Sequence, residues 1–305
     1  MINRHFHFFI NPAAGRLKQP ATLAKVQKAI RTRIPEADIS LIDPTTNTFR
    51  QSLSDCIKAG AIPVVVGGDG SISRMCTGLL ELTPSSKKPE MGVIPLGSGN
   101  DAARTLGLSL TMDKALSKLR STMAPRTIDL LELREDNTTL GHGLTLATFG
   151  FPTDVIRATE ALGWLGALKY AVGTLLALSR PATPPPTVSF RDCDVTMNQG
   201  IPRLVGLANG AYTGGGMKMV PSADIGDGQA DAIVLQPTGA LRLIWLLINV
   251  FAGTHVYDRK VSIKPCNQMH AKIDHPATIV LDGELFTVQG DVTVSVRPQA
   301  IHLFG

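Results

Sequence analysis

The stretch VVVGGDGSISR, residues 64–74, has three valines followed by a glycine-rich turn that contains one acid. β-Branched residues that run into a glycine turn and then an apolar stripe, Ile72, Met75 and Leu79, predict a buried strand followed by a helix. The glycines allow backbone N–H groups to approach a phosphate, and a helix N-terminus favours negative charge. The presence of an acid, Asp69, in such a turn requires an explanation, because a carboxylate repels phosphate unless Mg²⁺ or a substrate hydroxyl lies between them. The alternative is an acid in a tight turn, with no ligand.

A second stretch, MGVIPLGSGNDAARTLGL at residues 91–108, has the same organisation. A predicted strand leads into Gly97, Ser98 and Gly99, then Asn100 and Asp101, then a helix. Two adjacent strand ends that each offer glycines, a hydroxyl and an acid favour a phosphate site at the carboxyl edge of a parallel sheet. Neither stretch is a P-loop, and neither is the dinucleotide fingerprint, which disfavours a nicotinamide-dependent dehydrogenase.

The pattern of elements divides the chain in two. Strands and helices alternate up to about Pro125, which predicts a doubly wound, mostly parallel α/β domain over residues 1–125, with 295–305 as a candidate return to it. The predicted strands are 6–10, 39–42, 62–66 and 91–94, and the predicted helices are 17–33, 48–59, 71–82 and 100–106. Short extended runs then predict a mainly antiparallel β-sandwich over 126–294, interrupted by helices at 157–178 and 239–251.

Composition narrows the class of protein. The chain has 305 residues, of which 44% are hydrophobic and 18% charged, and a net charge of +5. This is typical of a soluble globular protein, and the absence of any block of like charges argues against a nucleic-acid partner. The cysteines at 56, 76, 193 and 266 lack metal-binding spacing, which predicts free thiols in a reduced, cytoplasmic location. The most apolar segment, 243–253, is about half of the roughly 20 residues that a membrane-spanning helix needs.

The motifs, taken in order, resemble a known family. NPAAG (11–15), GGDGS (67–71), PLGSGNDAAR (95–104), GGGMKMVPSADIGDGQAD (214–231) and DGE (282–284) are similar to the diacylglycerol kinase catalytic-domain family, which includes bacterial diacylglycerol and phosphatidylglycerol kinase-like proteins and sphingosine kinases. GGDG alone is shared with NAD kinases and phosphofructokinases. The resemblance implies a two-domain lipid kinase with ATP and Mg²⁺ in a cleft between the domains.

The resemblance also implies nucleotide contacts, residue by residue. They are Asn11, Thr46, Gly67, Gly68, Asp69, Gly70, Ser71, Gly97, Ser98, Asn100 and Asp101. Asp69 is expected near the metal and the phosphates, and Thr46 is chosen over Thr45. Ser71 and Ser98 stand where the family usually has threonines, which keeps the hydroxyl.

Two acids near the end of the chain are the candidates for acid–base chemistry. In IVLDGELF, Asp282 and Glu284 are expected on one side of an extended stretch, because alternate residues of a strand share a face. The alternative is a solvent-facing Asp-Gly hairpin turn. The resemblance places the general base here, where it accepts the proton of the lipid hydroxyl. The catalytic residues are therefore expected to be Glu284, with Asp282 as its rival, and Asp69.

A further acidic stretch, PSADIGDGQAD, is a candidate metal site. By resemblance, a structural Mg²⁺ is held by the carboxylate of Asp227 and by the backbone carbonyls of Asp224 and Gln229. The alternative is a turn with solvated acids.

The expected acceptor is a hydroxyl of diacylglycerol or a related glycerolipid at a membrane surface. Peripheral membrane contact is expected from the apolar segments 161–178 and 241–253, for which core packing is the alternative. Two other functions remain open: an NAD kinase-like or phosphofructokinase-like kinase of a soluble acceptor, and a catalytically silent nucleotide- or lipid-binding protein. A homodimer is also left open.

Overall fold

The computed structural model describes residues 4–120, 124–160, 162, 168–178, 183–193, 195 and 200–304. The chain divides into two compact units, Met1–Asp129 with Pro298–Gly305, and Leu130–Arg297. Two strands, β5 (Arg126–Glu135) and β13 (Glu284–Phe304), contribute residues to both units.

The first unit is built on a parallel sheet with strand order β13-β4-β3-β1-β2. Its other strands are β1 (Phe6–Ile10), β2 (Asp38–Leu41), β3 (Ile62–Gly67) and β4 (Glu90–Pro95). β13 joins it through His302 to Phe304, which pair in parallel with Glu90 to Gly92. The predicted α/β class is confirmed, and each strand expected up to Pro95 is present.

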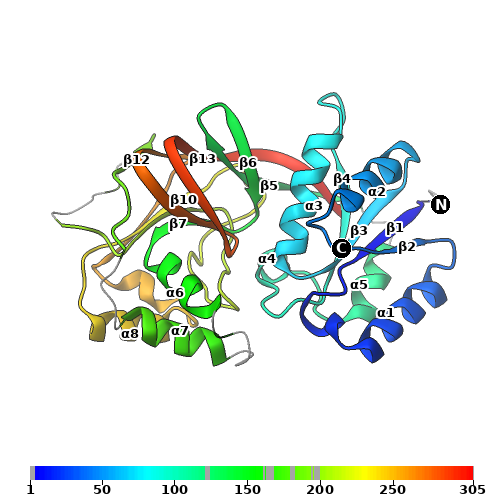
Figure 1. Ribbon diagram of the computed structural model, residues 1–305, viewed down its shortest axis with the longest axis horizontal. Coiled ribbons are helices and arrows are strands. Elements are labelled where there is room, and N and C mark those ends of the chain that lie inside the picture. Colours follow the sequence, from blue (N-terminus) through cyan, green and yellow to red (C-terminus); the bar gives the residue numbers. More distant parts are fainter. Residues whose placement is uncertain are drawn as a thin grey trace. The chain divides into compact units, whose positions relative to one another are not determined.

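Helices cover both faces of this sheet, with α1 and α5 on one side and α2 and α3 on the other (Figure 1). Their bounds are α1 (Pro20–Arg33), α2 (Asn47–Lys58), α3 (Asp69–Leu82), α4 (Asp101–Thr105) and α5 (Met112–Leu119), with a 3₁₀ turn η1 (Gly15–Lys18) before α1. β1 explains the arrangement, since its side chains alternate between the faces. Phe8 lies in a core with residues of α1 and α5, whereas Phe9 meets Phe49 of α2 edge to face, with ring centroids 5.8 Å apart.

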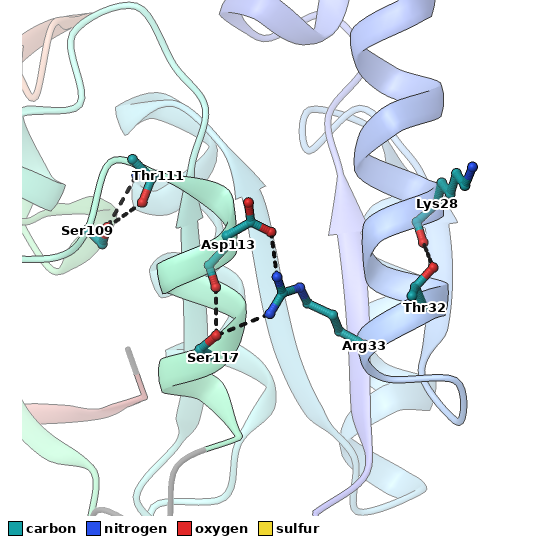
Figure 2. A network of polar contacts seen from close by, with 7 residues as sticks. All are labelled: Lys28, Thr32, Arg33, Ser109, Thr111, Asp113 and Ser117. Carbon is teal, nitrogen blue, oxygen red and sulfur yellow. Dashed lines mark hydrogen bonds and ion pairs between the residues drawn. The ribbon is translucent and has the colours of Figure 1, made fainter.

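Polar contacts join the end of α1 to α5 (Figure 2). Arg33 donates to the Asp113 carboxylate at 2.8 Å and to the Ser117 hydroxyl at 3.3 Å. The Ser117 hydroxyl in turn donates to the Asp113 carbonyl at 2.8 Å. Exposed ion pairs contribute under about 1 kcal/mol, so this contact orients α5 more than it stabilises the unit.

The second unit is a mostly antiparallel β structure, which confirms the predicted β-sandwich. Its main sheet has the order β11-β10-β9-β7-β12-β13, with β8 paired to β12 and β5 paired to β13 and β6. The strands are β6 (Thr138–Gly143), β7 (Leu146–Gly150), β8 (Val188–Arg191), β9 (Leu204–Ala208), β10 (Asp231–Leu235), β11 (Val261–Pro265) and β12 (Gln268–Leu281).

β10 shows how the main sheet is buried on both faces. Ala232 and Val234 lie in a core with residues of β5, β12 and β13. Ile233 and Leu235 point to the opposite face, into a second core. This alternation is the period of two that a strand imposes on its side chains.

The second core is covered by helices α6 (Phe151–Glu160), α7 (Leu168–Leu178) and α8 (Ala240–Asn249), which lie together on one side of the sheet (Figure 1). The helix predicted at 157–178 differs from this, because α6 begins at Phe151 and α7 begins at Leu168. Residues 161 and 163–167, which are part of that prediction, lie outside the described residues.

The predicted free thiols are present. Cys56, Cys76 and Cys266 are buried and Cys193 is partly exposed. Burial raises the pKa of the Cys56 thiol to about 12, which keeps it protonated and unreactive. Within the described residues, no helix combines the length and the apolar character needed to cross a membrane.

Candidate functional site

The carboxyl ends of β1, β3 and β4 lie level at one edge of the sheet in the first unit. The register pairs Ile10 with Val66, and Gly67 with Pro95. Asn11 N–H donates to the Val66 carbonyl at 3.1 Å, and Leu96 N–H donates to the Gly67 carbonyl at 2.8 Å. The loops that follow these strands carry the predicted nucleotide contacts at Asn11, Gly67 to Ser71, and Gly97 to Asp101. The structure therefore brings these three groups together.

Glycines allow the loops to touch. A Cβ placed on Gly97 would lie 2.3 Å from Gly68 Cα, and one on Gly15 would lie 2.7 Å from the Leu96 carbonyl oxygen. Real Cβ atoms do not approach backbone so closely, so a side chain at any of these positions would push two loops apart. Contact between loops is thus a second reason for these glycines, beside the close approach of a phosphate to the backbone.

Asp69 links two of the loops. It is the first residue of α3, and its Oδ1 accepts a hydrogen bond of 2.9 Å from Ala102 N–H in the first turn of α4. A carboxylate is favourable at a helix N-terminus, where backbone N–H groups have no intrahelical acceptor. This contact with Ala102 explains why an acid lies in the glycine turn even when no ligand is bound. The expected position of Asp69 near metal and phosphate stays a prediction.

Ser71 and Asn11 form the second link. Asn11 Nδ2 donates to Ser71 Oγ at 2.9 Å, and the Ser71 side chain is buried. A Cβ on Gly67 would lie 2.7 Å from the same Oγ, so the hydroxyl packs closely against the last residue of β3. Ser71 therefore links the start of α3 to the loop after β1.

Asn100 closes the third loop on itself. Its backbone is left-handed, with φ 55°, and its side chain accepts from Gly97 N–H at 2.8 Å and donates to the Gly97 carbonyl at 3.1 Å. Asp101 is buried at the start of α4, whereas Ser98 is exposed at the tip of the loop. Ser98 is thus the most exposed of these residues, and its contact with ATP stays a prediction.

The N-terminus of α3 offers backbone donors at the same edge. The first intrahelical bond runs from Ile72 N–H to the Gly68 carbonyl at 3.1 Å, so the N–H groups of residues 69–71 precede it. These groups and the helix dipole attract anions. A 14-residue helix that begins in a glycine loop is suited to hold a phosphate.

Thr46 has a local role. Its hydroxyl caps α2, accepting from Phe49 N–H at 3.3 Å and donating to the Asp43 carbonyl at 2.8 Å. Thr45 also binds Asp43, through its own hydroxyl, at 2.7 Å. Both threonines are thus engaged in the turn after β2, and the contact of Thr46 with ATP stays a prediction.

In the second unit, the D-G-E motif is a hairpin turn, and the expectation of an extended stretch is wrong. β12 ends at Leu281 and β13 begins at Glu284, which pairs with Leu281. Asp282 and Gly283 have φ values of 49° and 86°, the left-handed pair that a tight two-residue hairpin requires. Because Asp282 lies in the turn, the two acids do not share one face of a strand.

The Asp282 carboxylate is directed into the unit, unlike the solvent-facing acid of the alternative interpretation. Its oxygens accept hydrogen bonds from the N–H groups of Leu144, at 2.5 Å, Thr145, at 2.9 Å, and Leu146, at 3.2 Å. The Thr145 hydroxyl donates as well, at 2.7 Å. Burial raises the pKa of Asp282, and these hydrogen bonds oppose the shift. Asp282 thus holds the segment between β6 and β7, whereas Glu284 is partly buried at the start of β13.

Asn209 holds the same segment from the other side. Its Nδ2 donates to the Leu144 carbonyl at 2.9 Å, and its backbone N–H donates to the Thr145 carbonyl at 2.8 Å. Neither Asn209 nor Thr145 is among the site residues predicted from the sequence. Asn209 precedes a glycine at the end of a strand, which indicates only a turn, and nothing in the sequence points to its partner.

The candidate metal residues lie on the surface of the second unit. Asp224, Asp227 and Gln229 are exposed, and each aspartate accepts from the N–H group two residues further on. The pKa of Asp231 is raised, mainly by burial and to a smaller extent by the nearby charge of Asp227. The described part of the chain holds no cluster of three or more His, Cys, Asp or Glu side chains that could bind a metal. The predicted Mg²⁺ site, made of one carboxylate and two backbone carbonyls, stays a prediction.

Comparison with known proteins decides the family. Residues 5–133 match the diacylglycerol kinase catalytic domain, and residues 145–305 match the YegS C-terminal NAD kinase β-sandwich-like domain. The chain belongs to the diacylglycerol kinase and YegS-like lipid kinase family. Membership makes it a kinase, a transferase that takes phosphate from ATP, and accounts for the order of the motifs in both units.

Individual relatives agree with this assignment. A "Diacylglycerol kinase" of Mycobacterium tuberculosis (strain ATCC 25618 / H37Rv) is 28% identical over 268 residues, covering 87% of this chain and 84% of the relative. A "Probable lipid kinase YegS-like" of Yersinia enterocolitica is 28% identical over 241 residues, covering 77% of this chain and 75% of the relative.

Solved structures share the fold. The crystal structure of a diacylglycerol kinase from Bacillus anthracis matches 99% of this chain and 96% of its own, with a TM-score of 0.68 and 17% identity. Another chain from that organism matches with a TM-score of 0.74 and 19% identity, covering 99% and 97%. At this identity the likeness concerns the fold alone.

Proposed function

We propose that the protein transfers the γ-phosphate of ATP to a hydroxyl of a glycerolipid, with diacylglycerol as the first candidate. One observation carries the proposal: the loops after β1, β3 and β4 are fastened together at the edge where α3 begins. The links are Asn11–Ser71, Asp69–Ala102 and the backbone contact of Gly68 with Gly97. A rigid set of backbone N–H groups, positioned before the ligand arrives, is what phosphoryl transfer requires of a protein.

The residues of these loops have distinct roles in the proposal. The N–H groups of residues 69–71 and the Ser98 hydroxyl bind the phosphates of ATP. The carboxylate of Asp69 would hold a Mg²⁺ ion, which would neutralise charge on the transferred phosphate. The residues suit this role, because Asp69 and the donors of α3 belong to one turn.

The two acids of the hairpin have different tasks. Glu284 accepts the proton of the acceptor hydroxyl, and Asp282 is a positioning residue. Asp282 is not assigned as the base, because its oxygens already accept hydrogen bonds from the N–H groups of Leu144, Thr145 and Leu146. A base must have an oxygen available to its substrate.

A lipid acceptor is supported by the names of the relatives, among them a diacylglycerol kinase. In the second unit, Asp227 with the carbonyls of Asp224 and Gln229 would hold a structural Mg²⁺. Such a site binds a hard cation through oxygen atoms alone.

The test is an assay with γ-labelled ATP and Mg²⁺. Diacylglycerol, phosphatidylglycerol and a sphingoid base are offered in mixed micelles, and NAD is offered in solution. We expect label on the glycerolipid, with a loss of at least about a hundredfold in Glu284→Gln. Asp113→Asn makes the same carboxyl-to-amide change at the α1–α5 contact and should leave the rate unchanged. Label on NAD alone, or no label on any acceptor by a folded protein that binds ATP, would refute the proposal.

A further inference from the structure

Helix α8 of the second unit is apolar on two opposite sides. Leu243 and Leu246 are buried in the core that α8 shares with β9 and β10. The outward side carries apolar side chains spaced three and four residues apart, which forms a single stripe. They are Leu241, Ile244, Trp245 and Ile248, with exposed fractions of 85%, 38%, 49% and 69%. A surface helix ordinarily carries polar residues on this side.

Two more exposed apolar side chains follow the helix in the sequence. Phe251 is 55% exposed and Tyr257, in the 3₁₀ turn η3 (Thr254–Tyr257), is 87% exposed. η3 is joined to α8 by a hydrogen bond of 2.9 Å from the Thr254 hydroxyl to the Asn249 side chain. We call Leu241, Ile244, Trp245, Ile248, Phe251 and Tyr257 the α8 patch. Contiguous exposed apolar groups of this kind mark interaction surfaces.

The segments beside the patch are basic. Asp258 is the only acidic residue in the sequence from 232 to 264, and it is held by Arg242 through hydrogen bonds of 2.8 and 2.9 Å to its two oxygens. Arg259 and Lys260 follow it directly. Lys218 lies at the other end, where its N–H donates to the Val250 carbonyl at 3.0 Å. The patch is therefore flanked by positive charge that Asp258 does not neutralise.

We propose that the α8 patch docks the protein on the interfacial region of an anionic bilayer. A ten-residue helix is about 15 Å long, too short to span a bilayer but long enough to lie flat in its interface. Trp and Tyr favour this interface, and Lys and Arg beside it attract anionic lipid. The proposal goes beyond phosphoryl transfer, because binding to a bilayer needs no ATP.

The test is co-sedimentation with vesicles, without nucleotide. Vesicles of phosphatidylcholine with phosphatidylglycerol are compared with vesicles of phosphatidylcholine alone. We expect binding to the anionic vesicles, weakened at least tenfold in Leu241→Asn/Ile248→Asn. Arg259→Gln/Lys260→Gln should weaken it by about fivefold per base lost, and the effect should be smaller at high salt. Leu110→Asn, at a 40%-exposed leucine of the first unit, is the control and should bind like the wild type.

A second readout follows the patch itself. The chain has two tryptophans, Trp164 and Trp245, so Trp164→Phe leaves Trp245 as the reporter. Its emission should shift to the blue when anionic vesicles are added.

Three outcomes would overturn the proposal: a folded wild type that does not sediment, unchanged binding by the double asparagine variant, or a dimer that this variant dissociates while no form binds vesicles. The last would mean that a second copy of the chain covers the patch. Vesicle binding without phosphorylation of a dispersed short-chain substrate would instead reject the proposed function and leave the docking surface standing.

Discussion

Asp282 and Glu284 are two residues apart and have different surroundings. The carboxylate of Asp282 accepts hydrogen bonds from the backbone of 144–146, whereas Glu284 opens β13 opposite Leu281. A carboxylate so engaged fixes its partners in place, which supports a positioning role for Asp282. The proposal that Glu284 is the base rests on this engagement of Asp282 and on the resemblance of the D-G-E motif to the family's.

Substitution by the isosteric amide should separate the two roles. Asp282→Asn would direct an NH₂ group at a backbone N–H, so we expect a loss of about 1–3 kcal/mol in the free energy of unfolding. Glu284→Gln should cost less stability than Asp282→Asn but lower kcat by about a hundredfold or more. Urea unfolding and steady-state kinetics on both variants measure this. The reverse pattern would make Asp282 the base.

Asp69 offers a similar separation of structure from chemistry. Asp69→Asn keeps an oxygen that can accept from Ala102 N–H but removes the charge, whereas Asp69→Ala removes both. We expect the alanine variant alone to lose about 1 kcal/mol of stability, as for other helix caps. If the charge acts on metal and phosphate, kcat should fall strongly in both variants. Full activity in Asp69→Asn would show that the residue is only a cap.

At the scale of elements, each of the three loops of the first unit is joined to another by a hydrogen bond or a close backbone contact. Much of this unit follows from the sequence, since buried β-branched runs and apolar stripes alternate from Phe6 to Leu106. The start of α3 differs by two residues from the prediction, because Gly68 takes the capping position and Asp69 the first turn.

The contacts that lock the loops could not be predicted. Asn11 and Ser71 are 60 residues apart, and Asp69 and Ala102 are 33 apart. Only the register of the parallel strands brings them together. The hairpin at Asp282 was foreseeable from its Asp-Gly signal, but the inward direction of the carboxylate depends on a partner segment 136 to 138 residues away.

Gly97→Ala tests the contact between loops. The new Cβ would lie 2.3 Å from Gly68 Cα, so the loops must separate, and overpacking of this size costs about 1–3 kcal/mol. We expect the Kd for Mg-ATP, measured by titration calorimetry, to rise at least tenfold. Gly239→Ala is the matched control, because nothing lies within 4 Å of its Cβ position and its φ of −77° suits alanine. Equal ATP affinity in both variants would contradict the role given to the loops.

At the scale of the whole molecule, the protein combines a parallel α/β unit, which we propose binds the nucleotide, with an antiparallel unit that carries Asp282, Glu284 and the exposed apolar helix α8. Both units are covered by family matches, at residues 5–133 and 145–305. The identity of the lipid depends on the shape of its binding surface, which the order of motifs does not encode.

Metal removal should affect the two units differently. Chelation by EDTA should abolish phosphoryl transfer, and Mg²⁺ should restore it.

If Asp227 ligates a structural ion, Mg²⁺ without ATP should raise the melting temperature of the wild type and not that of Asp227→Asn. Asp224→Asn keeps its backbone carbonyl and should respond like the wild type. A wild type whose melting temperature ignores Mg²⁺ would argue that these acids form only a solvated turn.

In the proposed function, the loops after β1, β3 and β4 form a cradle for the phosphates of ATP. Hydrogen–deuterium exchange of the full chain, with Mg-ATP compared against adenosine with Mg²⁺, measures this. We predict that ATP slows exchange at residues 68–72 and 97–102 and that adenosine does not. Protection by ATP only at other residues, or at none, would contradict the claim.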